Sequence, residues 1–310
     1  MMTGLLIAVA ALWGAATGML VPRAAYRFSV PEEENWRERC PVGHPLRGPA
    51  RGWIGRARCG QCRTGDAYGP GTPNGGSGPR RSKGSSGPRT PNGGSGPRRS
   101  KGSSGPRTSN GSFVRRPAVG SSGSGTPTGT YGPSTPLLSL VTALLCAGLA
   151  AASGTRPEVA VWLLLAPVGV LLAVVDFRVR RLPDVLTLPL ATAALLLLGL
   201  VTLVPEHTGH WPSAALGALA LGAGYYVLWF VNPGGMGFGD VKLALGTGAV
   251  LGWYGWGTVL LGTFAGFLFG ALYGGALVVA GRAGRKTAVP FGPFLIAGAY
   301  LGLLIGAYTA

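Results

Sequence analysis

The chain has 310 residues, of which 47% are hydrophobic and only 12% are charged, and its formal net charge is +17. Soluble globular proteins average about 25% charged residues, so this composition excludes an ordinary soluble protein of two domains. Most of the positive charge lies before residue 136, and residues 136–310 form an apolar block with few charges. The composition therefore predicts an all-α, polytopic membrane protein.

Apolar runs recur along the chain, each close to the roughly 20 residues that a helix needs to cross a bilayer. No basic residue precedes the first run, which favours a retained helix over a cleaved signal peptide. We predict about eight transmembrane helices, over residues 3–22, 136–153, 158–177, 184–204, 213–231, 240–256, 257–280 and 291–310. The resulting regions are a first transmembrane helix (1–22), a cytoplasmic region (23–64), a disordered loop (65–135) and a seven-helix membrane core (136–310).

The basic residues predict the orientation of these helices, because Lys and Arg are retained on the cytoplasmic side of short loops. With the N-terminus outside, every Lys and Arg except Arg156 falls on the inside. The acids Glu158 and Glu206 then belong to outside loops. We therefore predict a multi-pass protein of the inner (plasma) membrane whose helices contact the lipid bilayer.

A perfect 18-residue repeat occupies the basic loop, where residues 72–89 recur as 90–107. The repeat has no apolar residue to bury, so it predicts a disordered segment rich in Gly, Ser and Pro rather than a packed domain. Its cations could contact anionic lipid or nucleic acid. A solvated linker is the simpler interpretation, and no nucleic-acid partner is expected.

Three acidic residues fall at the predicted inner ends of helices, where an ionisable group at membrane depth suggests function. Asp184 follows Pro183 and opens a helix, so it could simply complement the helix dipole. Asp240 could cap its helix, but it follows the glycine-rich segment 234–239. Such a backbone permits close approach and unusual φ values, which capping alone does not require.

Asp176 ends one helix and Asp240 begins another, so their side chains could meet at the inner membrane face. Two carboxylates in one site cannot both be charged cheaply, and such a pair would share one proton. The ionised member could then take a proton from water while the neutral member polarises a carbonyl, as in an aspartic peptidase. Two alternatives are a transporter or channel that binds ions or protons at these residues, and a scaffold with an inactive pair.

Three motifs follow one another on the predicted cytoplasmic face: Asp176-Phe-Arg-Val-Arg-Arg-Leu-Pro-Asp184, Gly235-Met-Gly-Phe-Gly-Asp240-Val-Lys242 and Pro290-Phe-Gly-Pro-Phe. In this order they resemble the type IV prepilin peptidases, a branch of the GxGD membrane aspartyl proteases. The resemblance implies eight helices and an endopeptidase that removes the leader from prepilin or pseudopilin precursors at the cytoplasmic face. It also implies cleavage after a leader glycine, before an apolar helix that remains in the membrane.

The resemblance assigns roles to individual residues of this chain. It implies that Asp176 and Asp240 are the catalytic pair and that the peptidase itself needs no cofactor. It further implies that the loops around substrate are shaped by Asp184, Gly237, Gly239, Lys242, Pro290 and Gly292.

The cytoplasmic region contains Cys40-Pro-Val-Gly-His44 and Cys59-Gly-Gln-Cys62. Cys59 and Cys62 have the spacing of a metal knuckle, and His44 could complete a tetrahedral zinc site with Cys40. Four unliganded side chains are the alternative, because a disulfide is disfavoured in a reducing compartment.

Many members of the family also N-methylate the new N-terminus, using S-adenosylmethionine. The family's stretch after the second cysteine pair resumes only at Tyr131, so residues 65–130 resemble an insertion. No acid stands in the resumed stretch where the family usually has Glu. S-adenosylmethionine is therefore expected only if methyltransferase activity is retained.

Two further patterns predict packing rather than chemistry. Small residues recur every four positions at Gly262, Gly266, Gly270 and Gly274, which predicts a helix face for close packing. An aromatic cluster near the inner interface predicts membrane anchors, and it consists of Tyr225, Tyr226, Trp229 and Phe230.

Overall fold

The computed structural model describes residues 2–31, 34–63, 130–282 and 289–310. Within these ranges the chain is helical and has no strand, only isolated bridges between Arg39 and Pro45 and between Arg58 and Thr130. The all-α prediction is confirmed. Apart from Thr130, the predicted insertion over 65–130 lies outside the described residues, and its repeats lie there entirely.

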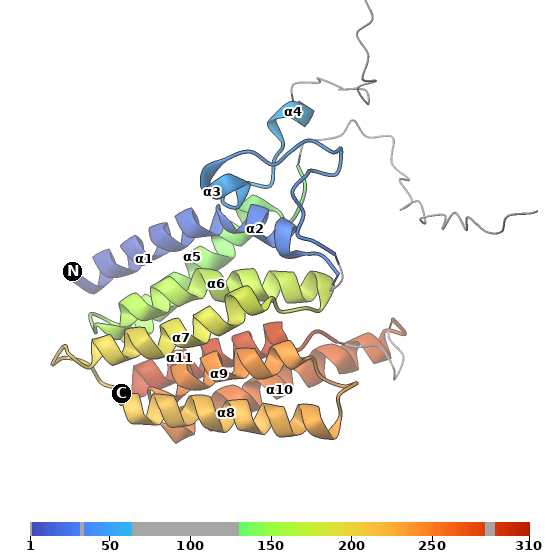
Figure 1. The fold of residues 1–310 in the computed structure, drawn as a ribbon. Helices are drawn as coiled ribbons and strands as arrows, with labels where there is room; N and C mark the ends of the chain where they lie inside the picture. The colour runs from blue at the N-terminus through green and yellow to red at the C-terminus, as the bar shows by residue number, and fades with distance from the viewer. Residues whose placement is uncertain (1, 32–33, 64–129, 283–288) are drawn as a thin grey trace, which may run out of the picture. The chain divides into compact units, whose positions relative to one another are not determined.

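A helix forms at each of the eight predicted apolar runs (Figure 1). These helices are α1 (Met2–Gly18), α5 (Thr135–Ser153), α6 (Glu158–Val179), α7 (Asp184–Val201), α8 (Trp211–Val231), α9 (Phe238–Gly252), α10 (Trp256–Val279) and α11 (Gly292–Thr309). Short helices α2 (Val21–Phe28), α3 (Pro49–Gly52) and α4 (Gly60–Arg63) belong to the region after α1.

The number of membrane spans is smaller than the number of predicted runs. Among the described residues, six helices are long and apolar enough to cross a membrane. A seventh span results if α1 and α2, which meet at a bend of 41°, form one span. Helix α9 has only 15 residues and falls short of that length. At 1.5 Å per residue it is about 22 Å long, less than the hydrocarbon thickness of about 30 Å.

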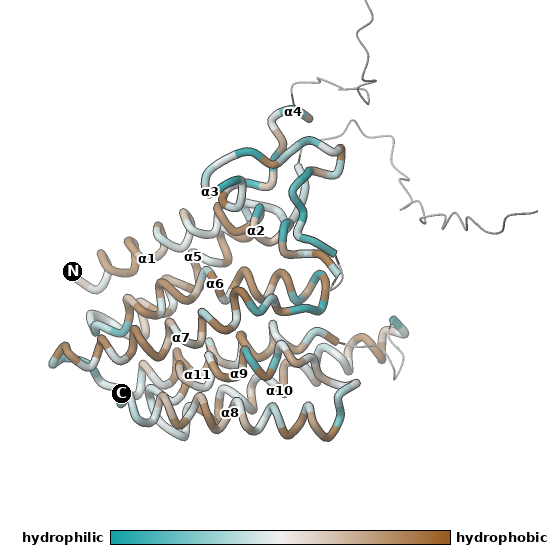
Figure 2. Tube along the Cα trace, viewed as in Figure 1, coloured by the Kyte–Doolittle hydropathy of each residue, from teal (hydrophilic) through white to brown (hydrophobic). Residues whose placement is uncertain are grey.

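The long helices pack side by side, with the most extensive contacts between α8 and α9, α1 and α5, and α10 and α11. Figure 2 shows that they are predominantly apolar and that hydrophilic residues gather in the segment between α2 and α4. A buried cluster joins α6, α9 and α11 through Leu172, Leu243 and Leu295, each no more than 1% exposed. Because lipid tails are as apolar as leucine, van der Waals packing rather than removal from water stabilises such a cluster between membrane helices.

The four-residue glycine pattern of α10 brings that helix into close contact with α11. A Cβ on Gly262 would lie 3.1 Å from the carbonyl oxygen of Gly298, and a Cβ on Gly266 would lie 3.1 Å from that of Phe294. Gly270 and Gly274 instead face side chains at 3.4 Å or more. The backbones are therefore closest at the first two of the four glycines.

Two side chains differ from the sequence-based expectation. Tyr225 was expected at the interface, but it is 2% exposed and its ring stacks on Phe267 at 5.8 Å. Glu158 was expected in an outside loop, but it begins α6 and is fully buried. The hydroxyl of Thr208 donates to its Oε1 at 2.6 Å, because the loop before α8 folds over the start of α6.

Replacing Gly298 with alanine should destabilise the α10–α11 pair. The new Cβ would overlap the Gly262 carbonyl oxygen and lie 2.5 Å from the Gly266 nitrogen, and overpacking of this kind costs about 1–3 kcal/mol. Gly275→Ala in α10 is the matched control, because a Cβ there meets nothing within 4 Å. Unfolding in detergent should occur at a lower temperature for Gly298→Ala only, and equal temperatures for both variants would contradict the packing argument.

Candidate active site

A cavity of about 350 Å³ lies between the C-terminal end of α6 and the N-terminal ends of α7 and α9. Its volume is within the range of about 300–1,000 Å³ typical of ligand pockets. Three carboxylates and three cations line it, so its formal charges balance: Asp176, Asp184, Asp240, Arg180, Arg181 and Lys242. The structure thus brings the two aspartates of the predicted pair to one cavity.

Asp176 occupies the last turns of α6 and is 4% exposed. The backbone N–H of Gly292 donates to its Oδ2 at 3.0 Å. Gly292 is the first residue of α11, where backbone N–H groups have no acceptor within the helix. A Cβ on Gly292 would lie 2.8 Å from the same carboxylate oxygen, so this close approach requires glycine. Pro290, just before α11, is half-buried.

Helix α6 ends three residues after Asp176, and its C-cap residue has an unusual conformation. The N–H of Arg180 donates to the Asp176 carbonyl oxygen at 2.7 Å, and Arg180 has a φ of 54°, in the left-handed region. Glycine or asparagine commonly fills this capping position, and a larger side chain there costs roughly 1–2 kcal/mol. Arg181 and Leu182, which follow this turn, both line the cavity.

Asp240 lies in the first turn of α9 and is 6% exposed. Its N–H donates to the carbonyl oxygen of Gly237 at 3.0 Å. The expectation of unusual φ values in segment 234–239 is wrong, because none of its glycines has a positive φ. The close approach is present at Gly239, where a Cβ would lie 2.8 Å from the Cβ of Leu182. A Cβ on Gly237 would make only an ordinary contact with Asp240, at 3.6 Å.

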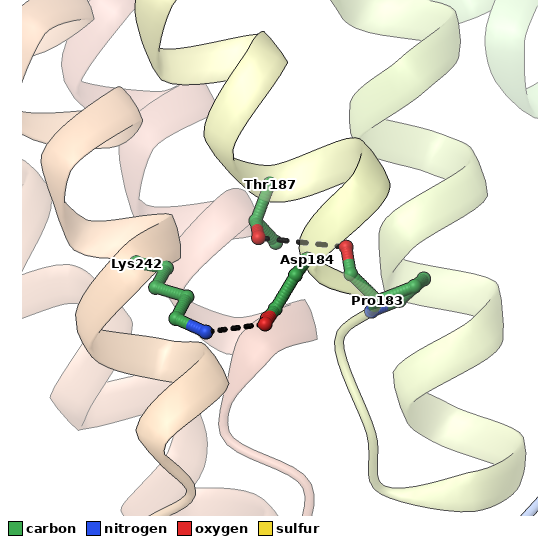
Figure 3. Close-up of polar contacts among 4 residues, drawn as sticks. All are labelled: Pro183, Asp184, Thr187 and Lys242. Carbon is green, nitrogen blue, oxygen red and sulfur yellow. Dashed lines mark hydrogen bonds and ion pairs between the residues drawn. The ribbon is translucent and has the colours of Figure 1, made fainter. Parts of the chain in front are cut away.

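Asp184 and Lys242 form an ion pair across the rim of the cavity (Figure 3). The two side chains point toward each other from α7 and α9, and Lys242 Nζ lies 2.6 Å from Asp184 Oδ2. Asp184 is also the first residue of α7, and an acid in the first turn complements the helix dipole as expected. The Thr187 hydroxyl supports the same turn by donating to the Pro183 carbonyl oxygen at 3.4 Å.

The predicted knuckle residues Cys40, His44, Cys59 and Cys62 converge in the region after α2. Their candidate ligand atoms all lie within 4.8 Å of one another. Cys40 Sγ is 3.7 Å from Cys62 Sγ, and His44 Nδ1 is 3.3 Å from Cys62 Sγ and 3.7 Å from Cys59 Sγ. Zinc–sulfur bonds of about 2.3 Å in a tetrahedron separate two sulfurs by about 3.8 Å. The cluster therefore fits a metal ion in both donor type and spacing.

The thiols of the cluster differ in acidity: burial and hydrogen bonds with Cys59 and Cys40 raise the pKa of the Cys62 thiol to about 12. Burial alone raises the pKa of the Cys59 thiol, but hydrogen bonds with Cys62, His44 and Cys40 outweigh it and lower this pKa to about 7. A thiol with such a pKa is partly thiolate at neutral pH, and the thiolate is the form that binds metal.

Trp36 was not among the predicted site residues, yet it lines the cavity with Asp176 and Asp240. It comes from the segment between α2 and Cys40, far from both aspartates in the sequence. No spacing or periodicity connects it to either of them. Only the fold brings this ring to the cavity.

Comparison with known proteins finds a family whose model matches part of the helical core. Residues 160–275 match the model of the type IV leader peptidase family. Similar curated proteins, each named "Prepilin leader peptidase/N-methyltransferase", come from Aeromonas salmonicida (36% identical over 179 residues), Pseudomonas aeruginosa (33% over 183) and Bacillus subtilis (32% over 174).

The alignments cover 55%, 56% and 55% of this chain and 58%, 59% and 66% of the three relatives, respectively. The chain thus matches less than two thirds of the length of each relative. No solved structure matches the chain.

The ion pair at the rim should add little to stability. The Asp184 side chain is 60% exposed and the Lys242 side chain 18%, and exposed pairs typically contribute about 0–1 kcal/mol. A double-mutant cycle with Asp184→Asn and Lys242→Gln, measured by unfolding in detergent, should therefore give a coupling free energy below about 1 kcal/mol. A coupling of several kcal/mol would show that the pair is far less solvated than its exposure indicates.

Proposed function

Because residues 160–275 of this chain match the model of the type IV leader peptidase family, we propose that the protein is a membrane aspartic endopeptidase that removes the leader from prepilin-like precursors. The observation that carries the proposal is the pair of buried carboxylates, Asp176 and Asp240, on one cavity at the ends of α6 and α9. Both lie inside the segment that matches the family.

The proposed chemistry follows from two carboxyl groups that share one proton. The ionised group takes a proton from a water molecule, whose oxygen attacks the carbonyl carbon of the scissile bond. The neutral group gives its proton to the carbonyl oxygen, and the tetrahedral intermediate collapses when the amine leaves with a proton. The hydrogen bond from Gly292 to Asp176 holds one carboxylate in place for this sequence.

We propose pilin or pseudopilin precursors as the substrates, cleaved after a leader glycine at the cytoplasmic face of the inner membrane, with the N-terminus of the chain outside. The distribution of Lys and Arg supports this orientation. The place of the cavity at helix ends supports a peptidase over a transporter, because transporter sites typically lie near the bilayer midplane.

The proposed organisation keeps a first transmembrane helix (1–22), a cytoplasmic region (23–64), a disordered linker (65–135) and a membrane core (136–310). We propose peptidase activity for this chain and leave N-methylation of the new N-terminus as an open alternative. S-adenosylmethionine would be a cofactor only if methyltransferase activity, which the names of the relatives include, is also present.

We propose that Cys40, His44, Cys59 and Cys62 hold a structural zinc ion. Four ligands without an open position are typical of structural rather than catalytic zinc. The ion would tie the chain around Cys40 to the short helix α4, which begins beside Cys59.

Asp176→Asn and Asp240→Asn should each abolish leader removal, because each leaves the site without one member of the proton-sharing pair. Rates should fall by at least about 100-fold, the lower range for loss of general acid–base catalysis. The assay compares precursor and processed forms on gels after the enzyme and a pilin-like precursor are reconstituted together in vesicles.

Glu206→Gln is the matched control, because Glu206 is an exposed carboxylate outside the cavity. It should process precursor at the wild-type rate. Processing at that rate by either Asp176→Asn or Asp240→Asn would show that the pair is not catalytic.

Purified protein should contain about one zinc ion per chain, and Cys59→Ser should remove most of it, since a site that loses one of four ligands binds metal far more weakly. Metal content is measured by inductively coupled plasma mass spectrometry. Cys146→Ser is the control, because Cys146 is buried in α5 and is not part of the cluster. Equal zinc in both variants would refute the assignment.

A further inference from the structure

Trp36 reaches the cavity from outside the segment that matches the family. Its ring packs against Phe28 and Trp53 with centroid distances of 5.3 Å each, in edge-to-face geometry. Arg27 lies over the Trp53 ring at 4.0 Å, and its Nη1 donates to the Arg51 carbonyl oxygen at 3.0 Å. One side of the indole is therefore held by a packed cluster, while 37% of the residue stays exposed.

The backbone on both sides of Trp36 is held by hydrogen bonds. Arg181, which also lines the cavity, donates from Nη1 to the Pro31 carbonyl oxygen at 3.1 Å. The N–H of Arg37 donates to the Arg27 carbonyl oxygen at 3.3 Å, and the Tyr26 hydroxyl donates to the Arg39 carbonyl oxygen at 3.1 Å. The position of Trp36 is thus set by contacts with α2 and with the loop that follows α6.

The cavity that both aspartates line is small for a ligand pocket. Its volume of about 350 Å³ is near the lower end of the range of about 300–1,000 Å³ for ligand pockets. A peptide carbonyl that reaches both carboxylates must place the adjoining side chain in this same space. The aromatic rings that line the cavity are those of Trp36 and Phe238, and of these only Trp36 comes from outside the helices that carry Asp176 and Asp240.

We infer that Trp36 is a specificity-determining residue, whose indole limits the size of the side chain next to the scissile bond. This inference rests on the proposed peptidase function. A smaller residue at position 36 widens the cavity without changing either carboxylate, so it relaxes the size limit rather than abolishing the chemistry.

The test compares two precursors that differ only in the residue before the cleaved bond, glycine in one and alanine in the other. For each enzyme variant the ratio of kcat/KM for the alanine precursor to that for the glycine precursor is measured in reconstituted vesicles. Trp36→Ala should raise this ratio by about tenfold or more, since a single methylene in a tight pocket changes discrimination by about 10–200-fold. Trp36→Phe, which keeps an aromatic wall, should retain most of the wild-type discrimination.

Trp13→Ala is the matched control, because Trp13 lies in α1 and does not line the cavity. Its ratio should equal that of wild type. Trp36→Leu provides a second test if the alanine variant does not fold, since leucine keeps apolar contact with Phe28 and Trp53 and should also raise the ratio.

Two results would count against the inference in distinguishable ways. If wild type processes the glycine precursor and every folded Trp36 variant keeps the wild-type ratio, Trp36 does not set the size limit, and the proposed function stands. If wild type processes neither precursor, the proposed function itself fails and the inference fails with it.

Discussion

The hydrogen bond from Gly292 to Asp176 joins the two helix ends on which the candidate site depends. It connects the beginning of α11 to the end of α6 at a distance of 3.0 Å, and it provides an acceptor for a backbone N–H that lies at a helix start. The same contact keeps a carboxylate that is only 4% exposed in a defined orientation. Because Leu295 in α11 and Leu172 in α6 are packed in one buried cluster, the helices cannot separate at this point without opening the core.

Glycine serves this site through its small size rather than through its conformational freedom. Gly239 and Gly292 both lie where a Cβ would come within 3.0 Å of another residue, Leu182 in one case and Asp176 in the other. Neither has a positive φ. The strained backbone at the cavity instead belongs to Arg180, whose left-handed φ of 54° ends α6 and turns the chain toward α7. The close packing of three helix ends therefore requires glycine at positions 239 and 292. The strained backbone of Arg180 is required instead by the reversal of the chain after α6.

Much of the fold could be predicted from the sequence because apolar runs determine membrane helices almost independently of one another. Asp176 and Asp240 were also predictable, since acids are rare in the apolar block and both fall at helix ends on one face. Two other features were not predictable, because they depend on which helix faces which. They are the ion pair between Asp184 and Lys242 and the burial of Tyr225. The place of Trp36 at the cavity could not be predicted for the same reason, because it depends on contacts with α2 and the loop after α6.

The segment from Glu34 to Cys40 connects the candidate active site with the cysteine–histidine cluster. Trp36 lines the cavity at one end of this segment, and Cys40 is a candidate ligand at the other. Two backbone contacts hold the chain between these two residues. They are the bridge from Arg39 to Pro45 and the hydrogen bond from the Leu46 N–H to the Glu38 carbonyl oxygen. Each residue spans at most about 3.6 Å. The four residues from Trp36 to Cys40 therefore cannot keep Trp36 in place if the cluster is displaced far. A region outside the helical core therefore shapes one wall of the cavity, and the residue that does so lies four positions before a candidate metal ligand.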